Sequence, residues 1–466
     1  MKKSLPLVFG LLFTGNCAAL PLMEYLGLVA QAHPELQSLE TRSEQYAADR
    51  QYAEGAYDTE FAHKTASRVT GYYDGIYSTQ EISQRLKPFN SEVFTQYRVS
   101  DGEFPVYEEQ NRTLSEGEAS VGLRISLLQN RTIDEDRYNI LLAENDRRKW
   151  QQQIKIAQSE FYYTAILAYA EWAKASQYYR LSLQMLETTL NRRKGISTRV
   201  NTGDLARIVL TEFETQLMQR EITALNAEQT LRASYEQLRY FIPRDIATSP
   251  DQYKALVDLE FAWPSALIMA TNELTPSSSH PAIQSKLVEV EKAEQDLRLA
   301  ENKLLPKMDL EMAVAKDFGS GPESLEEKET KVALKLSVPL RRTQAKAKKT
   351  KAEFKLRQVY RDLEALIRAL NVSLAQTEIN LEYSQKLTRK QRQQVALARE
   401  LFAQEQKRFA LGASDFFLLN TRETNAFKAQ QDHLDAIFAV NKQRLALLKI
   451  QAALDHDFVQ ALTQGQ

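Results

Sequence analysis

The five histidines are the side chains best suited to acid–base or metal chemistry at neutral pH, and their spacing favours neither. They are His33, His63, His280, His433 and His456. No pair has His-x-x-x-His spacing, and the single cysteine excludes Cys-x-x-Cys. Asp432 and Asp435 flank His433, but a solvated helix face explains them better than an acid–base site. Without a glycine-rich phosphate loop either, the sequence predicts no enzyme, cofactor, nucleotide or metal site, and a partner must supply energy.

Composition and the N-terminal residues indicate an exported protein. The chain has 466 residues and a net charge of −1, which gives no electrostatic reason to expect nucleic acid. Residues 1–19 resemble a signal peptide, with cleavage after Ala19; a lipoprotein signal with acylated Cys17 is the alternative. After residue 20 no apolar run approaches the ~20 residues of a spanning helix. We therefore expect the periplasm or outer membrane of a Gram-negative cell, with strands for any membrane crossing.

Two long proline-free stretches predict long helices. The second contains one glycine, Gly412, and is otherwise rich in strong helix formers, so it predicts a hairpin with Gly412 at its tip. Its first arm, Thr343 to about Arg408, would be roughly 100 Å long at about 1.5 Å per residue. The return helix would run over about Asp415–Asp457. Apolar residues recurring every three or four positions near 161–173 and 434–452 predict a packing seam.

The chain reads as a duplication. His33-Pro34 parallels His280-Pro281, each at a predicted helix start. In the first half a long helix, Thr132–Lys194, opens with a capping-box pattern at Thr132. A turn over 195–203 and a return helix over about 204–241 follow. Each half therefore predicts helix, strand, loop, strand, long helix, turn and helix.

The predicted repeats have definite boundaries along the chain. They span 20–241 and 280–458, with a linker or equatorial unit over 242–279 and a tail over 459–466. The loop 74–119 in the first repeat is much longer than its counterpart, and its length predicts a functional or partly ordered loop. Segments such as Glu92–Val99 are candidates for an extra hairpin there.

Four segments predict strands, two per repeat. Ser120–Leu127, Met308–Val314 and Lys331–Val338 alternate apolar and polar residues, while Tyr57–Tyr73 alternates poorly. A soluble sandwich is the alternative, but the chain supplies no second set of strands. Two copies would give an eight-stranded barrel filled by side chains, and three a twelve-stranded one with a lumen. The polar face favours three copies, because its charges would then face water. Its charged residues, the predicted lumen, are Arg124, Asp309, Glu311 and Lys335.

This arrangement resembles the TolC family of outer-membrane efflux and secretion channels. The resemblance rests on the duplicated order, on the turn Arg408-Phe409-Ala410-Leu411-Gly412, and on the strand Val332–Pro339 leading into a lysine-rich helix start. It implies a mainly α fold with a small membrane β part: a homotrimer whose twelve-stranded barrel continues into a long periplasmic α-helical barrel, with 242–279 as a belt. It also implies contact with outer-membrane lipid, a periplasmic adaptor (membrane fusion protein) and an inner-membrane pump.

The resemblance places the periplasmic entrance and the adaptor contact at the helix tips. Many family members carry acidic rings just after the turn, but here those positions hold Leu418 and Thr421. We expect Val209, Phe417 and Leu418 to form an apolar constriction instead. Ion pairs among charged residues beside the turns are a second expectation, with simple N-caps at the aspartates as the alternative. The whole predicted site comprises Arg199, Gly203, Asp204, Val209, Arg408, Gly412, Asp415, Phe417, Leu418 and Thr421.

The function predicted is a passive outer-membrane exit duct of a tripartite efflux or type I secretion system. A periplasmic coiled-coil scaffold or adaptor without a pore is the alternative, although adaptors also carry β-rich, glycine-containing lipoyl-like segments that this chain lacks. A cell-wall hydrolase would need a nucleophile–base pair that the sequence does not offer. The cargo (drug, metal ion, polysaccharide or polypeptide) and the class of pump stay open.

Overall fold

A computed structural model describes most of the chain. The described residues are 21–68, 70–71, 74–242, 279–456 and 458–459. The predicted signal peptide with Cys17, residues 243–278 of the predicted linker, and residues 460–466 of the predicted tail lie outside them.

The chain forms two compact units. One, which we call the strand unit, comprises residues 40–153 and 282–366. The other, the helical unit, takes its described residues from 1–39, 154–281 and 367–466. Some helices contribute residues to both units, and each of them is one continuous helix.

Seven α-helices are described, and the long ones are those that composition predicts. They are α1 (Leu22–Ala32), α2 (Pro34–Glu54), α3 (Glu135–Asn201), α4 (Arg207–Arg239), α6 (Pro281–Asn302), α7 (Thr343–Ala410) and α8 (Phe416–Ile450). The hairpin with Gly412 between its arms is confirmed, and α7 has 68 residues. None of the described helices is long and apolar enough to cross a membrane.

Two details of the first hairpin differ from the prediction. Gly195 lies inside α3 rather than in the turn, which occupies 202–206. One glycine costs a helix about 1 kcal/mol relative to alanine, and a helix of 67 residues tolerates it. The residue that caps α3 is Asp134, whose carboxylate accepts the Arg137 N–H at 2.9 Å. The predicted cap at Thr132 is therefore wrong, because the helix begins at Glu135.

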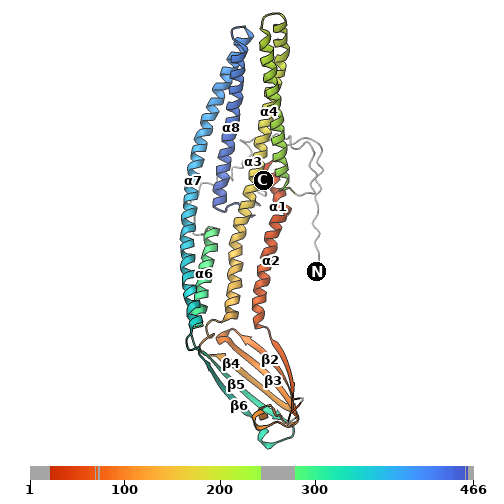
Figure 1. The fold of residues 1–466 in the computed structure, drawn as a ribbon, viewed down its shortest axis with the longest axis vertical. Coiled ribbons are helices and arrows are strands. Elements are labelled where there is room, and N and C mark those ends of the chain that lie inside the picture. Colours follow the sequence, from red (N-terminus) through yellow and green to blue (C-terminus); the bar gives the residue numbers. More distant parts are fainter. Residues whose placement is uncertain (1–20, 69, 72–73, 243–278, 457, 460–466) are drawn as a thin grey trace. The chain divides into compact units, whose positions relative to one another are not determined.

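The strand unit contains one antiparallel sheet of six strands in sequence order (Figure 1). The strands are β1 (Glu60–Ser67), β2 (Ile76–Leu86), β3 (Ser91–Asp101), β4 (Gly117–Ser126), β5 (Lys307–Phe318) and β6 (Glu329–Ser337). The predicted count of four is wrong, since the long loop contributes β2 and β3 and they pair with β1 and β4. The other four strands lie where the sequence predicts them.

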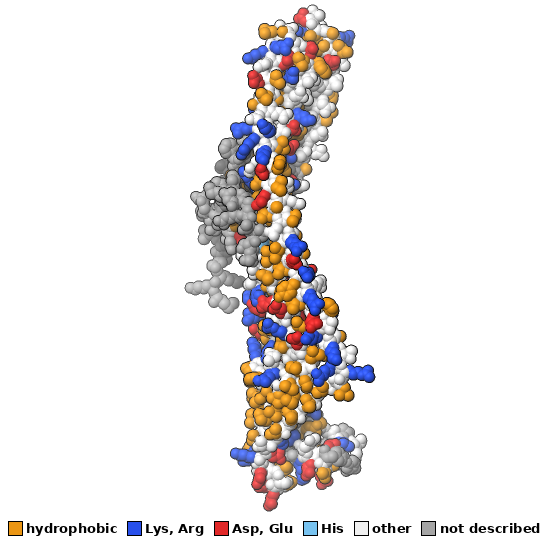
Figure 2. Space-filling model, turned by 90° about the vertical axis from the view of Figure 1, so that its left-hand side faces the viewer, with side chains coloured by type: hydrophobic (Ala, Val, Ile, Leu, Met, Phe, Trp, Pro, Cys, Tyr) orange, Lys and Arg blue, Asp and Glu red, His pale blue; other side chains and the backbone are white. Residues whose placement is uncertain are grey.

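Each sheet strand alternates between two faces. On β4 and β5 the apolar face carries Val121, Leu123 and Met312, and the polar face carries Arg124 and Glu311. The register between neighbouring strands is unbroken, so residues directly opposite each other share a face throughout. Figure 2 shows apolar side chains gathered over the strands on the face turned to the viewer.

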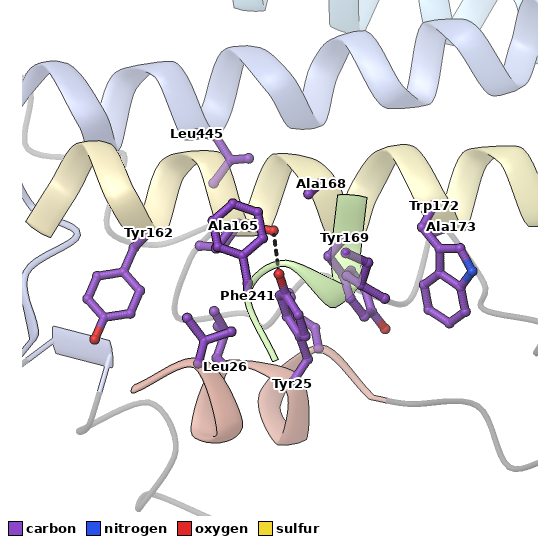
Figure 3. Packing of buried hydrophobic residues seen from close by; sticks show 14 of the residues in the cluster. Tyr25, Leu26, Tyr162, Ala165, Ala168, Tyr169, Trp172, Ala173, Phe241 and Leu445 are labelled. Carbon is purple, nitrogen blue, oxygen red and sulfur yellow. Dashed lines mark hydrogen bonds between the residues drawn. The ribbon is translucent and has the colours of Figure 1, made fainter. Parts of the chain in front are cut away.

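The helical unit is held together by a large apolar core where α1, α3, α4 and α8 meet. Tyr162, Tyr169 and Trp172 of α3 are almost completely buried there (Figure 3). The Tyr25 hydroxyl donates to the carbonyl oxygen of Ala165 at 3.1 Å, so the one polar atom of that ring is satisfied. Burial raises the pKa of Tyr25 well above its usual value. Leu445 and Leu448 of α8 complete the contact, which confirms the predicted seam.

The duplicated His-Pro pairs perform the same task in both halves. The His33 ring donates from Nε2 to the carbonyl of Tyr240, just past the end of α4, at 3.2 Å. The His280 ring donates from Nε2 to the carbonyl of Ile450, the last residue of α8, at 2.6 Å. The His33 Nδ1 also accepts the N–H of Glu35, which caps α2. Each ring therefore satisfies a carbonyl at a helix C-terminus.

Candidate functional site

The two hairpin turns of the helical unit close in the same way. Gly203 and Gly412 both have positive φ, +84° and +74°. In the first turn the carbonyl of Arg199 accepts the N–H of Asp204 at 2.8 Å. In the second the carbonyl of Arg408 accepts the N–H of Ala413 at 2.9 Å. A glycine in the left-handed conformation, followed by such a hydrogen bond, ends many helices. A Cβ at either glycine would meet open space, so backbone conformation alone selects glycine there.

The aspartates after the two turns differ in role. Asp415 is the N-cap of α8, with its carboxylate accepting the Leu418 N–H at 2.7 Å. Asp204 accepts a hydrogen bond from the Thr202 hydroxyl at 3.2 Å, and the N-cap of α4 is Ala206, which has no capping side chain. The capping alternative thus holds for Asp415 and is wrong for Asp204, because the first turn is longer before its helix begins.

The predicted arginines make local contacts. The Arg408 guanidinium donates to the Ala413 carbonyl at 3.2 Å and lies 3.7 Å from the Glu405 carboxylate. The Arg199 guanidinium lies over the Phe409 ring, 5.3 Å from its centre. Because Arg199 is on α3 and Phe409 on α7, this cation–π contact joins the two hairpins near their turns.

A small apolar cluster packs the two hairpins together beside the turns. Its buried members are Ile196, Phe213, Leu217 and Phe416. The rings of Phe213 on α4 and Phe416 on α8 are 5.9 Å apart, and Phe409 lies 6.4 Å from Phe416. These are ordinary distances for favourable aromatic pairs.

The structure separates the three predicted gate residues. Val209 packs against the buried cluster, Leu418 is half-buried, and Phe417 is 72% exposed. The Thr421 hydroxyl donates to the Phe417 carbonyl at 2.9 Å, a bond within α8. Within one copy, then, Phe417 is the one of these three predicted residues that offers a large exposed apolar surface for a constriction.

A buried charged triad, which sequence reasoning missed, links the hairpins further from the turns. The two terminal nitrogens of the Arg192 guanidinium on α3 donate to the Glu423 carboxylate on α8, each at 2.8 Å. Arg220 on α4 donates to the same carboxylate at 3.0 Å and to Asn420 at 3.0 Å. The Arg220 and Glu423 side chains are only 4% and 6% exposed. Burial lowers the pKa of Arg220, and the Glu423 charge opposes that shift.

Two sequence signals for the triad were available. Arg220 lies on the buried stripe of α4 that also carries Leu217 and Ala224. Glu423 lies on the same stripe of α8 as Phe416, Leu419 and Ala426, all buried. A carboxylate in an apolar stripe needs a buried partner. The sequence does not reveal that the partners are Arg192 and Arg220, because they lie on other helices more than 200 residues away.

A groove of about 930 Å³ runs between α4 and α8 beside the triad and the turns. Ile208 and Phe417, both largely exposed, line one end, and Arg220 and Asn420 line its wall. The groove therefore offers apolar contact area near the turns and hydrogen-bonding groups further along, a combination typical of protein docking surfaces.

The predicted lumen residues lie on the polar face of the sheet. Arg124 donates to Glu311 at 3.3 Å, and Asp309 accepts the Ser126 hydroxyl at 2.9 Å. Lys335 lies opposite Asp309 across the β5–β6 pair. Arg124 also contacts Glu81 and Glu92, which the sequence did not single out as lumen residues. Glu92 lies in the segment considered for an extra hairpin, whereas the strand that carries Glu81 was not predicted.

Two further histidines bind neighbouring hydroxyl groups, and His433 is half-buried on α8. The His456 ring is hydrogen-bonded to the Tyr162 hydroxyl at 2.8 Å, and His63 to the Thr65 hydroxyl at 3.0 Å. Lys174 pairs with Asp435 at 3.1 Å, as expected of a solvated face. Among the described residues no cluster of three or more His, Cys, Asp or Glu could hold a metal ion.

Part of the chain matches a known protein family. Residues 277–453 match the model of a family described as outer membrane efflux protein. No curated protein sequence matches the chain.

Among solved structures, the outer membrane protein VceC of Vibrio cholerae superposes with a TM-score of 0.65 at 12% identity, covering 92% of this chain and 96% of that one. The MtrE outer membrane channel of Neisseria gonorrhoeae gives 0.60 at 12% identity, with coverages of 94% and 90%. CusC gives 0.62 at 11% identity, covering 96% of both chains.

Proposed function

We propose that this chain, whose residues 277–453 match the outer membrane efflux protein family and whose fold is that of TolC-family channels, is an exit duct of the outer membrane. It passes substrates passively from a periplasmic adaptor and an inner-membrane pump to the exterior. The single observation that carries the proposal is the sheet: one of its faces is apolar and exposed, the other charged, as a wall between lipid and water requires.

The assembly proposed is a homotrimer. The two outermost strands of the sheet, β1 and β6, each pair on one side only within the described residues. A lipid environment tolerates no open sheet edge, so neighbouring copies must cover them. The scaffold alternative gives no reason for the exposed apolar residues Val332, Leu334 and Leu336 on β6, each more than 60% exposed.

The periplasmic entrance is proposed at the turns, with Phe417 and Leu418 narrowing it. Replacing both by alanine is expected to raise the single-channel conductance of the reconstituted trimer, because an apolar constriction resists wetting. Met218→Ala is the matched control: Met218 is exposed on α4 and does not line the groove. Conductance equal to that of the parent would remove Phe417 and Leu418 from the gate.

The adaptor is proposed to dock in the groove between α4 and α8. A photo-crosslinking residue at Ile208 is expected to capture the periplasmic adaptor encoded with the channel, while one at Met218 is not. Heat-resistant trimers on gels test the assembly independently. A protein that stays monomeric and gives no conductance would contradict the duct itself.

A further inference from the structure

The inserted hairpin β2–β3 is a full part of the sheet. Both strands have 11 residues; β2 pairs with β1 over residues 76–83, and β3 pairs with β4 over residues 92–98. Ile82 of β2, for example, lies opposite Phe61 of β1 on one side and Thr95 of β3 on the other. The hairpin therefore lies within the sheet, between β1 and β4, and not as a cap over its end.

One arginine on the polar face binds the insertion to the rest of the sheet. The Arg124 guanidinium on β4 contacts carboxylates on three other strands: Glu81 of β2, Glu92 of β3 and Glu311 of β5. It also lies 4.0 Å from the centre of the Phe94 ring on β3. Two acidic partners thus come from the inserted strands themselves.

Phe94 packs closely against the opposite strand. It faces Gly122 of β4, where a Cβ would approach the ring to 2.3 Å. The glycine therefore leaves the space that the ring of the inserted strand fills, so the sequences of β3 and β4 fit each other sterically as well as electrostatically.

The apolar face continues across the insertion to the edge strand. Following the register from β6 to β3, one row runs through Val332, Met312, Leu123 and Val93. The next row continues it to the other edge. Its members are Thr330, Val314, Val121, Thr95, Ile82 and Phe61. Ile82 and Phe61 are 47% and 65% exposed. A single row of mostly apolar residues therefore reaches both edges of the sheet, flanked on β2 by Gln80 and Gln84.

We propose that every copy contributes all six strands to the membrane wall, with β1 of one copy pairing with β6 of the next. Three copies then close a barrel of three times six, or eighteen, strands in place of the twelve that the family resemblance implies. This inference rests on the proposed function. All five pairings are antiparallel, so the two edges run in opposite directions and pair head to tail around a ring. Six strands of one copy are too few for a barrel, since known ones start at eight.

The larger strand count changes what the membrane part does. Barrel diameter grows roughly linearly with strand number, so eighteen strands give a barrel about half as wide again as twelve. Barrels of about that size enclose an aqueous channel. The membrane segment is then wide and polar inside, which suits bulky hydrated cargo, and restriction falls to the hairpin turns.

Engineered cysteine pairs test which strands meet between copies. In a full-length Cys17→Ala background, Phe61→Cys on β1 is combined in turn with a cysteine at each β6 position from 330 to 336. At least one pair is expected to give disulfide-linked trimers on a non-reducing gel after oxidation in membranes. Thr95→Cys is the matched control, because it shares the apolar face but lies on β3, already paired on both sides.

The outcomes separate this inference from the function on which it rests. The twelve-strand alternative also has β1 and β6 at its edges, but it places β1 beside β4, whereas the six-strand sheet places β1 beside β2, with Phe61 opposite Ile82. An intramolecular disulfide between Phe61→Cys and Val121→Cys, with none between Phe61→Cys and Ile82→Cys, would overturn the six-strand wall in favour of twelve strands. Heat-resistant trimers that conduct but form no β1–β6 cross-link would also overturn it and leave the duct intact. A parent protein with neither trimers nor conductance would refute the duct.

Discussion

Helices α3, α4 and α8 pack together in two places within the helical unit, by two different kinds of contact. In the large core, contact is almost wholly apolar, with Trp172 1% exposed between Tyr169 and Tyr235. Nearer the turns, it depends on the small Phe213–Phe416 cluster and on the triad around Glu423. The apolar core spreads its stabilising contacts over many side chains. The triad depends on the single negative charge of Glu423, so removing that charge leaves two buried arginines unpaired. We therefore expect the helices to separate more readily near the turns than at the large core.

The largest effect is expected in the apolar core. Trp172→Ala should reduce the free energy of unfolding by about 3–5 kcal/mol, because it leaves a cavity where α3 meets α4. Chemical denaturation of the purified protein measures this loss. Trp172→Phe keeps a ring in place and should lose less. If the alanine variant unfolded as the parent does, the core would not be what holds these helices.

Glu423→Gln should come next, with a loss of about 3 kcal/mol, because it leaves two guanidinium groups buried without a counter-charge. The loss should be local, raising conductance while the trimer persists on gels. Loss of the trimer together with the conductance change would contradict a contact confined to the turn end.

A companion variant sharpens the comparison with the core. Replacing the whole triad by apolar residues, with Arg192→Met, Arg220→Met and Glu423→Leu, should recover most of the lost stability, since buried ion pairs are often no better than apolar packing. In this variant the hairpins would be joined near the turns by apolar packing, as they are in the large core. We expect it to conduct less than the parent, and an unchanged conductance would show that the triad has no part in opening.

Asp415→Ala should cost about 1 kcal/mol, the usual cost of losing an N-cap side chain. Asp204→Ala at the corresponding place in the first repeat is the control, and it should cost much less because no helix N–H depends on that carboxylate. Thermal unfolding of the two variants side by side measures the difference. Equal losses would mean that the duplicated turns work alike.

Much of this fold follows from local patterns in the sequence. The 3.6-residue period and the absence of proline predict α7 and α8, and the two-residue period predicts β4, β5 and β6. Residues 277–453 match the outer membrane efflux protein family, as the resemblance leads us to expect, and the superposed structures share the fold. The division into two repeats and the roles at the turns stay predictions.

What sequence reasoning missed has physical causes. β2 carries Ser78, Gln80 and Gln84 on the same face as Ile82, so it shows no two-residue period and reads as a loop. Its strand character comes from its neighbours in the sheet, which a local pattern cannot show. The triad joins residues far apart in the chain. Glu423 and Arg220 each stand in an apolar stripe of their helix, but the sequence does not show that the two meet.

The smallest effect on stability is expected at Phe417, and its neighbour makes the test sharp. Phe417→Ala should change the free energy of unfolding by less than about 0.5 kcal/mol, as for most exposed positions, whereas Phe416→Ala should cost about 3 kcal/mol because that ring is buried between the hairpins. If Phe417 lines the entrance, its variant should still raise conductance. A Phe417→Ala protein that loses as much stability as Phe416→Ala would mean that the exposed ring is buried between copies. Apolar burial would then stabilise the region near the turns, as it does the large core, and the difference between the two regions would be smaller.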